Sequence, residues 1–267
     1  MIRHTIHKLW PRASVVLLLL WAPAALAGQP GAIVAQQPGF TLVPYGWVAS
    51  LKGTIGVPGE DVDDGEGGLL ERLDVTMDDD YDLVGFMFYG EWRSEGRWMA
   101  FIDSVWANFS RGAEVKISRL LPSSDIEATV DGNIVTGAVG FRAKDWENAS
   151  LTVYGGARYY DLKLEVKARG GVLPSPITIP ANDSWTDALL GARLSYGLGK
   201  RWQGLFQADY AFGDSDGTWD LSAILEYTFS WGAVRGGYRH MIADYTAPAY
   251  RLDVDLTGPL LGVAFTF

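Results

Sequence analysis

Apolar side chains recur at every second position along most of this sequence. In one clear run, mostly polar residues separate Trp219, Leu221, Ala223, Leu225, Tyr227 and Phe229. A second run extends from Trp202 to Phe212. Because successive side chains of a strand point to opposite faces, this period indicates strands with one apolar and one polar face. Aromatic residues stand at both ends of each apolar face, which is typical of strands that face lipid.

Ten segments carry this alternation, and the connections between them differ in length. The predicted strands are residues 40–55, 81–94, 96–109, 126–143, 149–163, 185–198, 200–212, 218–230, 233–246 and 250–267. Four connections are tight turns, at 94–96, 144–148, 199–200 and 231–232. The others are mostly long, at 56–80, 110–125, 164–184, 213–217 and 247–249. An even number of strands places both termini and all the tight turns at one end, as in outer-membrane barrels.

The backbone of such a sheet decides how it must be completed. In hydrocarbon every N–H and C=O group needs a partner, so a sheet that spans a membrane must close on itself. The sequence therefore predicts an all-β fold. This fold is a single antiparallel transmembrane β-barrel of about ten strands, with short periplasmic turns and longer outer loops.

The first 27 residues have the pattern of an export signal. A basic stretch up to Arg12 precedes an apolar core over residues 13–21, and Ala25-Leu26-Ala27 has the small residues of a cleavage site. The apolar stretch is shorter than the ~20 residues of a spanning helix, which is the alternative. We expect cleavage near Ala27. It divides the chain into a signal peptide, residues 1–27, and an outer-membrane barrel domain, residues 28–267.

Charge and cysteine content exclude several classes of protein. The chain has 22 lysines and arginines against 32 acidic residues, a net charge of -10, whereas a general nucleic-acid binder needs a basic face. It contains no cysteine, which excludes disulfides, thiol catalysis and cysteine-ligated zinc. We therefore expect neither a nucleic-acid partner nor a cofactor.

The polar faces of the predicted strands collect acids and arginines in nearly equal number. If the aromatic positions face lipid, the charged residues that face the lumen are Glu91, Asp103, Arg142, Arg158, Asp187, Arg193, Asp209, Asp220, Glu226, Arg235 and Arg239. Arginine suits forked pairing with several carboxylates in a confined space, and ten strands enclose an interior little wider than eight strands do. We expect an internal salt-bridge network that closes the lumen. The alternatives are a narrow, charge-lined path for small ions or polar solutes and a catalytic carboxylate pair.

Catalytic motifs are missing or incomplete. His240 is the one histidine beyond the predicted signal peptide, and nothing in the spacing of Ser222 and Asp244 requires a triad with it. Parity places His240 with Tyr238 and Ile242 on the lipid face. The sequence has no Gly-x-Ser-x-Gly, no His-Glu-x-x-His and no phosphate loop. It therefore predicts no catalytic residue.

The first long connection is acidic. The candidate ligands of a weak divalent-cation site are its carboxylates Asp61, Asp63, Asp64 and Glu66. The bidentate glutamate of a calcium loop is missing at the required spacing, and a solvated loop without metal is the alternative. Residues 69–73 are expected to form one or two helical turns over the barrel mouth. The connection at 164–184 contains Gly170-Gly171 and three prolines and is expected to be irregular.

The end of the chain carries a further signal. Phe267 is preceded by apolar residues at every second position, which resembles the C-terminal signature of Gram-negative outer-membrane barrels. Arg251, Asp253 and Asp255 have the same parity as Phe267, so one set must face the lumen and the other lipid. We expect a bulge at Gly258-Pro259, because proline cannot donate to the ladder and a bulge exchanges the faces.

The C-terminal half resembles a group of uncharacterised Gram-negative outer-membrane β-barrel proteins. From Trp185 onward the resemblance rests on Gly191-Ala192-Arg193, Trp202, Asp209-Tyr210, Trp219, Gly237-Tyr238-Arg239, Asp244-Tyr245, Gly258-Pro259-Leu260-Leu261-Gly262 and Phe267. The N-terminal half agrees more loosely, through Pro44-Tyr45-x-Trp47, residues 69–73 and Trp98 with Asp103. The resemblance implies the barrel fold and the outer membrane, and it implies no catalytic residue. It also implies that Arg193, Asp209 and Arg239 belong to a recurring lumen arrangement.

Together these patterns favour a non-enzymatic outer-membrane barrel that is structural or forms a narrow pore. The expected partners are outer-membrane lipid and lipopolysaccharide, and the barrel-assembly machinery through Phe267. One rival function is an outer-membrane hydrolase that acts on lipid or peptide at the outer rim. The other is a soluble periplasmic barrel that binds an apolar ligand, with its aromatic faces turned inward.

Overall fold

The computed structural model describes residues 38–57, 73–77, 82–112, 124–170, 177–247 and 251–267. The predicted export signal and the candidate metal ligands of the first loop lie outside these residues. The strands are β1 (Gly39–Val57), β2 (Leu73–Met77), β3 (Asp82–Arg93), β4 (Trp98–Gly112), β5 (Ser124–Asp145), β6 (Ala149–Gly170), β7 (Ile177–Gly197), β8 (Trp202–Gly213), β9 (Gly217–Thr228), β10 (Ala233–Thr246) and β11 (Arg251–Thr266).

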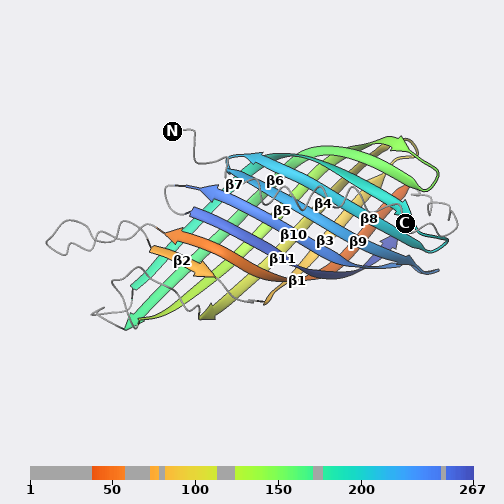
Figure 1. Cartoon of the computed structure of the whole chain (residues 1–267). Coiled ribbons are helices and arrows are strands. Elements are labelled where there is room, and N and C mark those ends of the chain that lie inside the picture. The colour runs from red at the N-terminus through yellow and green to blue at the C-terminus, as the bar shows by residue number, and fades with distance from the viewer. Residues whose placement is uncertain (1–37, 58–72, 78–81, 113–123, 171–176, 248–250) are drawn as a thin grey trace.

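The strands form one antiparallel sheet that closes on itself (Figure 1). Ten of them make the wall in the order β1, β3 to β11, and β11 pairs with β1. The remaining strand, β2, pairs only with β1, from Gly53 to Val57. The predicted ten-stranded antiparallel barrel is confirmed. In the described part of the chain, no helix is long and apolar enough to cross a membrane.

The two ends of the barrel differ. At one end consecutive strands are joined by the short segments 94–97, 146–148, 198–201 and 229–232. The first and last strands meet at the same end, where the backbones of Phe40 and Phe267 exchange hydrogen bonds of 3.1 and 2.9 Å. This end is called the turn end below, and the opposite end is called the loop end.

An apolar belt surrounds the outer face of the barrel. Exposed aromatic residues near the turn end are Trp92, Trp98, Phe141, Trp202, Phe229, Trp231 and Phe265, and those nearer the loop end are Phe86, Trp106, Tyr159, Phe212 and Trp219. Exposed aliphatic residues, such as Ile102, Leu190 and Leu261, lie between the two rows. Trp202 and Phe212 are separated by about 33 Å along β8 at ~3.3 Å per residue, or roughly 25 Å after a tilt of ~40°. The belt therefore has the height of a bilayer's hydrocarbon core.

One expectation for the connections is wrong, and a second can be compared with the structure at a single residue. In the segment 164–184, the described residues 164–170 and 177–184 are not irregular, because β6 continues to Gly170 and pairs with β7 from Ile177 onward (Figure 1). In β6, residues Leu162 to Lys167 alternate between apolar and charged side chains. This alternation favours a strand, although Gly and Pro residues follow it. Leu73, the last residue of the expected helical turns, begins strand β2, and residues 69–72 lie outside the described residues.

The bulge expected at Gly258-Pro259 is also wrong. The register between β10 and β11 is unbroken from Ala233–Ala264 to Thr246–Arg251, so the faces do not exchange. A Cβ atom on Gly258 would lie 1.9 Å from the carbonyl oxygen of Val48, so glycine is required here because the β1 backbone approaches closely. Arg251, Asp253 and Asp255 therefore share the outer face with Phe265. They lie toward the loop end, while the apolar residues of that face lie toward the turn end.

Candidate functional site in the lumen

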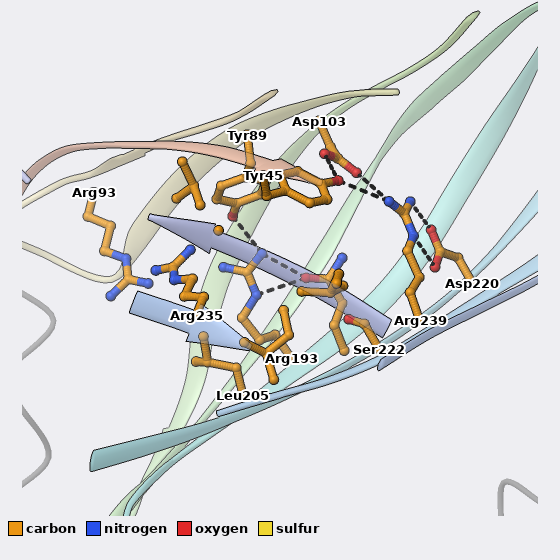
Figure 2. Close-up of a pocket in the computed structure, with 15 residues that line it drawn as sticks. Tyr45, Tyr89, Arg93, Asp103, Arg193, Leu205, Asp220, Ser222, Arg235 and Arg239 are labelled. Carbon is orange, nitrogen blue, oxygen red and sulfur yellow. Dashed lines mark hydrogen bonds and ion pairs between the residues drawn. The ribbon is translucent and has the colours of Figure 1, made fainter. Parts of the chain in front are cut away.

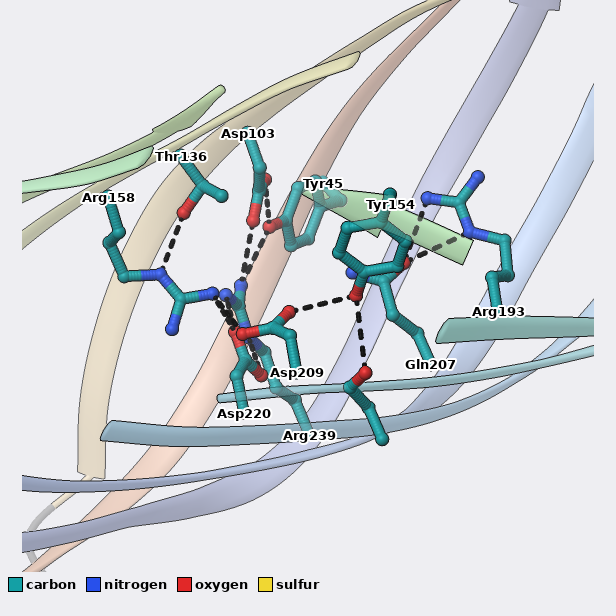
Figure 3. A network of polar contacts seen from close by, with 11 residues as sticks. Tyr45, Asp103, Thr136, Tyr154, Arg158, Arg193, Gln207, Asp209, Asp220 and Arg239 are labelled. Atoms are coloured by element: carbon teal, nitrogen blue, oxygen red, sulfur yellow. Dashed lines mark hydrogen bonds and ion pairs between the residues drawn. The ribbon is translucent and has the colours of Figure 1, made fainter. Parts of the chain in front are cut away.

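Charged side chains fill the middle of the barrel. Arg158, Asp209, Asp220 and Arg239 are all buried, although each is ionisable, and they come from β6, β8, β9 and β10. Arg158 donates from Nη2 to Asp209 at 2.8 Å and to Asp220 at 3.2 Å. Arg239 holds Asp220 with two hydrogen bonds, 3.0 Å from Nε and 2.6 Å from Nη2 (Figure 3). Asp220 is therefore shared by two guanidinium groups.

Neutral side chains complete the bonding of this group. Arg239 reaches Asp103 on β4 at 3.2 Å and donates from Nη1 to the Tyr45 hydroxyl at 3.0 Å. That hydroxyl in turn donates to Asp103 at 2.6 Å (Figure 3). Tyr154 donates to Asp209 at 2.9 Å, and Arg158 donates from Nε to Thr136 at 2.9 Å. The mid-height network is defined here by its charged members Asp103, Arg158, Asp209, Asp220 and Arg239. Buried charges are tolerated in such a place when they are paired and hydrogen-bonded in this way.

A second charged group lies nearer the turn end. Arg193 on β7 donates from Nη1 to Glu91 on β3 and from Nη2 to the Tyr89 hydroxyl at 2.7 Å. It also donates to Gln207 from Nε at 3.1 Å and from Nη2 at 2.8 Å (Figure 3). Its guanidinium carbon lies 5.3 Å from the centre of the Phe101 ring, within the range of a cation–π contact. Arg193 thus uses all three of its nitrogens.

Two further arginines complete the turn-end cluster. Arg93 donates to Glu91 from Nε, and Arg235 donates to Glu226 from Nε at 2.5 Å. The side chains of Arg93 and Arg235 are 18% and 14% exposed, so both reach solvent, unlike Arg158 at 1%. The turn-end cluster is defined here as Glu91, Arg93, Arg193, Glu226 and Arg235. Together the two groups contain five arginines and five carboxylates.

The structure brings together nine of the eleven predicted lumen residues: Glu91, Asp103, Arg158, Arg193, Asp209, Asp220, Glu226, Arg235 and Arg239. Arg142 is not among them, because β5 shifts register between Arg142 and Lys144 and the side chain pairs with Asp145 beside the turn. Asp187 is buried but binds Ser215, accepting from its N–H at 3.0 Å and from its hydroxyl at 2.6 Å. It fastens the short connection between β8 and β9.

Sequence reasoning missed several members of the two groups. Arg93 has the same parity as Glu91, so its lumen position was available from the alternation. The hydroxyl groups of Tyr45, Tyr89 and Tyr154 also bond to lumen carboxylates. Tyr89 and Tyr154 stand on the polar parity of their strands, and a tyrosine on a polar face is the signal that identifies them. Tyr45 carries no such signal, because it shares its parity with Val43 and Trp47.

Apolar side chains occupy the lumen on the loop-end side of the mid-height network. Trp47, Met87 and Met241 are almost fully buried in one cluster, and the Trp47 ring lies 5.2 Å from the Arg239 guanidinium carbon. Further toward the loop end, Trp185 stacks between Tyr160 and Tyr245, with ring centres 4.6 and 3.8 Å away. Apolar and aromatic side chains thus pack in the lumen between the mid-height network and the loop end.

A pocket of about 80 Å³ lies on the other side of the network, toward the turn end. Figure 2 shows Arg93, Arg193 and Arg235 around it, with Asp220 and Arg239 at its inner limit. Val43, Leu205 and Leu260 contribute apolar wall. The pocket therefore joins an arginine-rich mouth to a partly apolar interior.

The candidate catalytic residues do not meet. Ser222 lines the lumen pocket, whereas His240 lies on the outer face, where its Nε2 is 3.8 Å from Asp255. A Ser222–His240 pair would have to pass through the barrel wall. Among the described residues, no group of three or more His, Asp or Glu side chains is arranged to hold a metal ion.

Comparisons with known proteins agree with this architecture. No family model matches the chain, and no curated protein matches its sequence. Among solved structures, the outer-membrane protease OmpT from Escherichia coli is similar at a TM-score of 0.57 and 12% identity, over 86% of this chain and 97% of OmpT. The translocator domain of the autotransporter NalP from Neisseria meningitidis follows at 0.49 and 15% identity, over 87% and 90% of the two chains. The likeness to OmpT shows that the chain has the fold of outer-membrane β-barrels.

Proposed function

We propose that this protein is a non-enzymatic barrel of the bacterial outer membrane whose lumen is closed at mid-height. The single observation that carries the proposal is that the mid-height network bonds strands on opposite sides of the barrel. Arg239 on β10 binds Asp103 on β4, although three strands separate them along the shorter way around the wall and five along the longer way. Such a bond must cross the interior. The network therefore fills the cross-section that a solute would have to use.

The physical cost of opening this network supports a closed lumen. Arg158 and Asp209 are each 1% exposed, and a passing ion would have to separate charges that are already desolvated. Breaking one partner away from a buried pair leaves an uncompensated charge, at a cost of about 3–5 kcal/mol. The apolar cluster around Trp47 and Met241 adds a second barrier. This observation favours the plugged alternative over the narrow pore.

The outer-membrane location rests on the outer face and on the sequence. The continuous belt of exposed aromatic and aliphatic residues is far more apolar than the surface of a soluble protein tolerates. The rival soluble barrel would need these faces turned inward. The predicted export signal and the resemblance of the C-terminal half to outer-membrane proteins support the same location. The exposed Phe267 side chain at the turn end fits recognition by the barrel-assembly machinery, and the belt fits contact with lipid and lipopolysaccharide.

The proposal is tested by solute efflux from lipid vesicles that contain the refolded protein. Folding is verified first on a detergent gel, where the folded barrel should migrate differently in unheated and in heated samples. We expect vesicles with the folded barrel to retain potassium ions and small sugars as well as protein-free vesicles do. Rapid efflux that scales with the amount of folded barrel would contradict the closed lumen and favour the pore.

A further inference from the structure

The two arginines at the mouth of the turn-end pocket differ from the other three lumen arginines in how they bond. Arg158, Arg193 and Arg239 each donate from a terminal guanidinium nitrogen to a carboxylate. Within the described residues, Arg93 and Arg235 bond their glutamates through Nε alone. Among the described residues, the terminal nitrogens of Arg93 and Arg235 therefore have no carboxylate partner and are available to a ligand.

These unused donors face a common space. Arg93 and Arg235 both line the pocket, and Figure 2 shows their guanidinium groups directed into it. Arg93 and Arg193 both pair with Glu91, and Arg235 lines the same pocket as these two arginines. The turn-end cluster contains three arginines and two glutamates and has one positive charge in excess. The mid-height network, with two arginines and three aspartates, has one negative charge in excess, so the positive charge is concentrated at the mouth of the pocket, where it would attract an anion.

We infer that the turn-end pocket binds a small organic anion, whose acidic group is held by the terminal nitrogens of Arg93 and Arg235. Paired guanidinium groups match the two oxygens of a carboxylate, and charge-assisted hydrogen bonds are the strong ones. The chemistry beyond the acidic group is set by the pocket wall. Val43, Leu205 and Leu260 line it, so an apolar body fits better than a sugar or a second charge.

The site is reached from the turn end, which is the periplasmic end in the proposed orientation. Arg93 ends β3 beside the turn at 94–97, and Arg235 lies near the start of β10, which follows the turn at 229–232. Both side chains are partly exposed, so solvent can reach the pocket at this end. Asp220 and Arg239 of the mid-height network form the inner limit. The pocket is thus a blind vestibule, and its ligand need not cross the barrel.

Ligand-observed fluorine NMR tests this inference, with 4-fluorobenzoate as the probe and the folded protein in nonionic detergent. We expect saturable binding of 4-fluorobenzoate above the background of empty micelles. The neutral analogue 4-fluorobenzyl alcohol should show none. Inorganic phosphate should bind at least about ten-fold more weakly than 4-fluorobenzoate, because it gains nothing from the apolar wall. Phosphate binding that equals or exceeds that of 4-fluorobenzoate would overturn the organic part of the assignment.

Variants place the binding at the two arginines. Arg93→Gln and Arg235→Gln should each weaken 4-fluorobenzoate binding by roughly ten-fold or more, because each removes charge-assisted donors. Arg97→Gln is the matched control, since Arg97 loses the same charge at the same end but is half exposed and pairs with Asp145. If Arg235→Gln does not fold, Arg235→Lys keeps the charge and loses the fork, and it should still weaken binding. Absent binding, or binding that these variants leave unchanged, would overturn the inference.

Discussion

The mid-height network and the turn-end cluster contain the same kinds of residue but use them differently. At mid-height, two arginines pair with three aspartates, and every acid is shared by two arginines or bonded to a tyrosine. All members of this group except the partly buried Asp103 are buried. At the turn end, three arginines pair with two glutamates, and Arg93 and Arg235 bond their glutamates through Nε and not through a terminal nitrogen. The two groups therefore differ in the ratio of cations to anions and in which guanidinium nitrogens donate. This difference underlies the two proposed roles, closure of the lumen at mid-height and anion binding at the turn end. Composition alone would have treated the two groups as one.

The largest effect should follow from breaking the mid-height network. Arg239→Ala removes both bonds to Asp220 and the bond to Asp103. We expect the free energy of unfolding to fall by about 3–5 kcal/mol, because Asp103 loses its arginine and the buried Asp220 keeps only the 3.2 Å contact with Arg158. Urea unfolding, followed by intrinsic tryptophan fluorescence in the same lipid, measures this loss. An Arg239→Ala barrel as stable as an Arg97→Ala barrel would show that the network does not hold the strands together.

Arg193→Ala should have the next largest effect. It removes the bonds to Glu91, Tyr89 and Gln207, but Glu91 keeps Arg93 as a partner. We expect a loss of about 1.5–3 kcal/mol, the range for hydrogen bonds to a charged group. The same urea titration provides the measurement. A loss larger than that of Arg239→Ala would reverse the order that the comparison sets.

Arg235→Ala should have a smaller effect on stability. The Arg235 and Glu226 side chains are 14% and 11% exposed, against 1% for Arg158 and Asp209, so water can reach Glu226 when its partner is removed. We expect a loss of about 1 kcal/mol or less. A destabilisation similar to that of Arg193→Ala would place Arg235 among the structural residues and remove the distinction drawn within the turn-end cluster.

The smallest effect is expected on the outer face. His240 is 33% exposed and lies 3.8 Å from Asp255, so His240→Ala should change stability by less than about 0.5 kcal/mol. The variant also addresses the rival hydrolase, because His240 is the one histidine available to it. Any hydrolytic activity of the purified protein should be identical in His240→Ala and the wild type. A loss of hydrolysis in this variant would contradict the non-enzymatic proposal.

Much of this architecture is predictable from the alternation alone. Strand parity identifies the lumen residues correctly for Asp209, Asp220 and Arg239, because a strand's side chains have a strict period of two. Parity does not identify partners. Asp187 and Asp220 look equivalent in sequence, yet Asp187 is taken by Ser215 in the neighbouring connection, and Asp220 is held by two arginines.

The wrong predictions for Arg142 and for Gly258-Pro259 each have a specific physical cause. Arg142 has lumen parity but stands beside the register shift of β5, which turns it to Asp145. Gly258-Pro259 interrupts a strand pattern in the manner of a bulge, but glycine is needed there because β1 passes so close. The Trp47 indole donates to the carbonyl of Gly258 at 3.1 Å across this contact. Contacts between residues more than 200 positions apart are not visible in a local pattern.

Single-barrel current in a planar bilayer tests the central claim most directly, with wild-type protein and Arg239→Ala measured under the same salt and voltage. A closed wild type should give no discrete steps. Folded Arg239→Ala should conduct small steps, because the variant loses the side chain that crosses the lumen and on which the Trp47 ring of the apolar cluster rests at 5.2 Å. Discrete steps from the wild type itself, unchanged in Arg239→Ala, would contradict the account: the ions would then pass by a route that the mid-height network does not block.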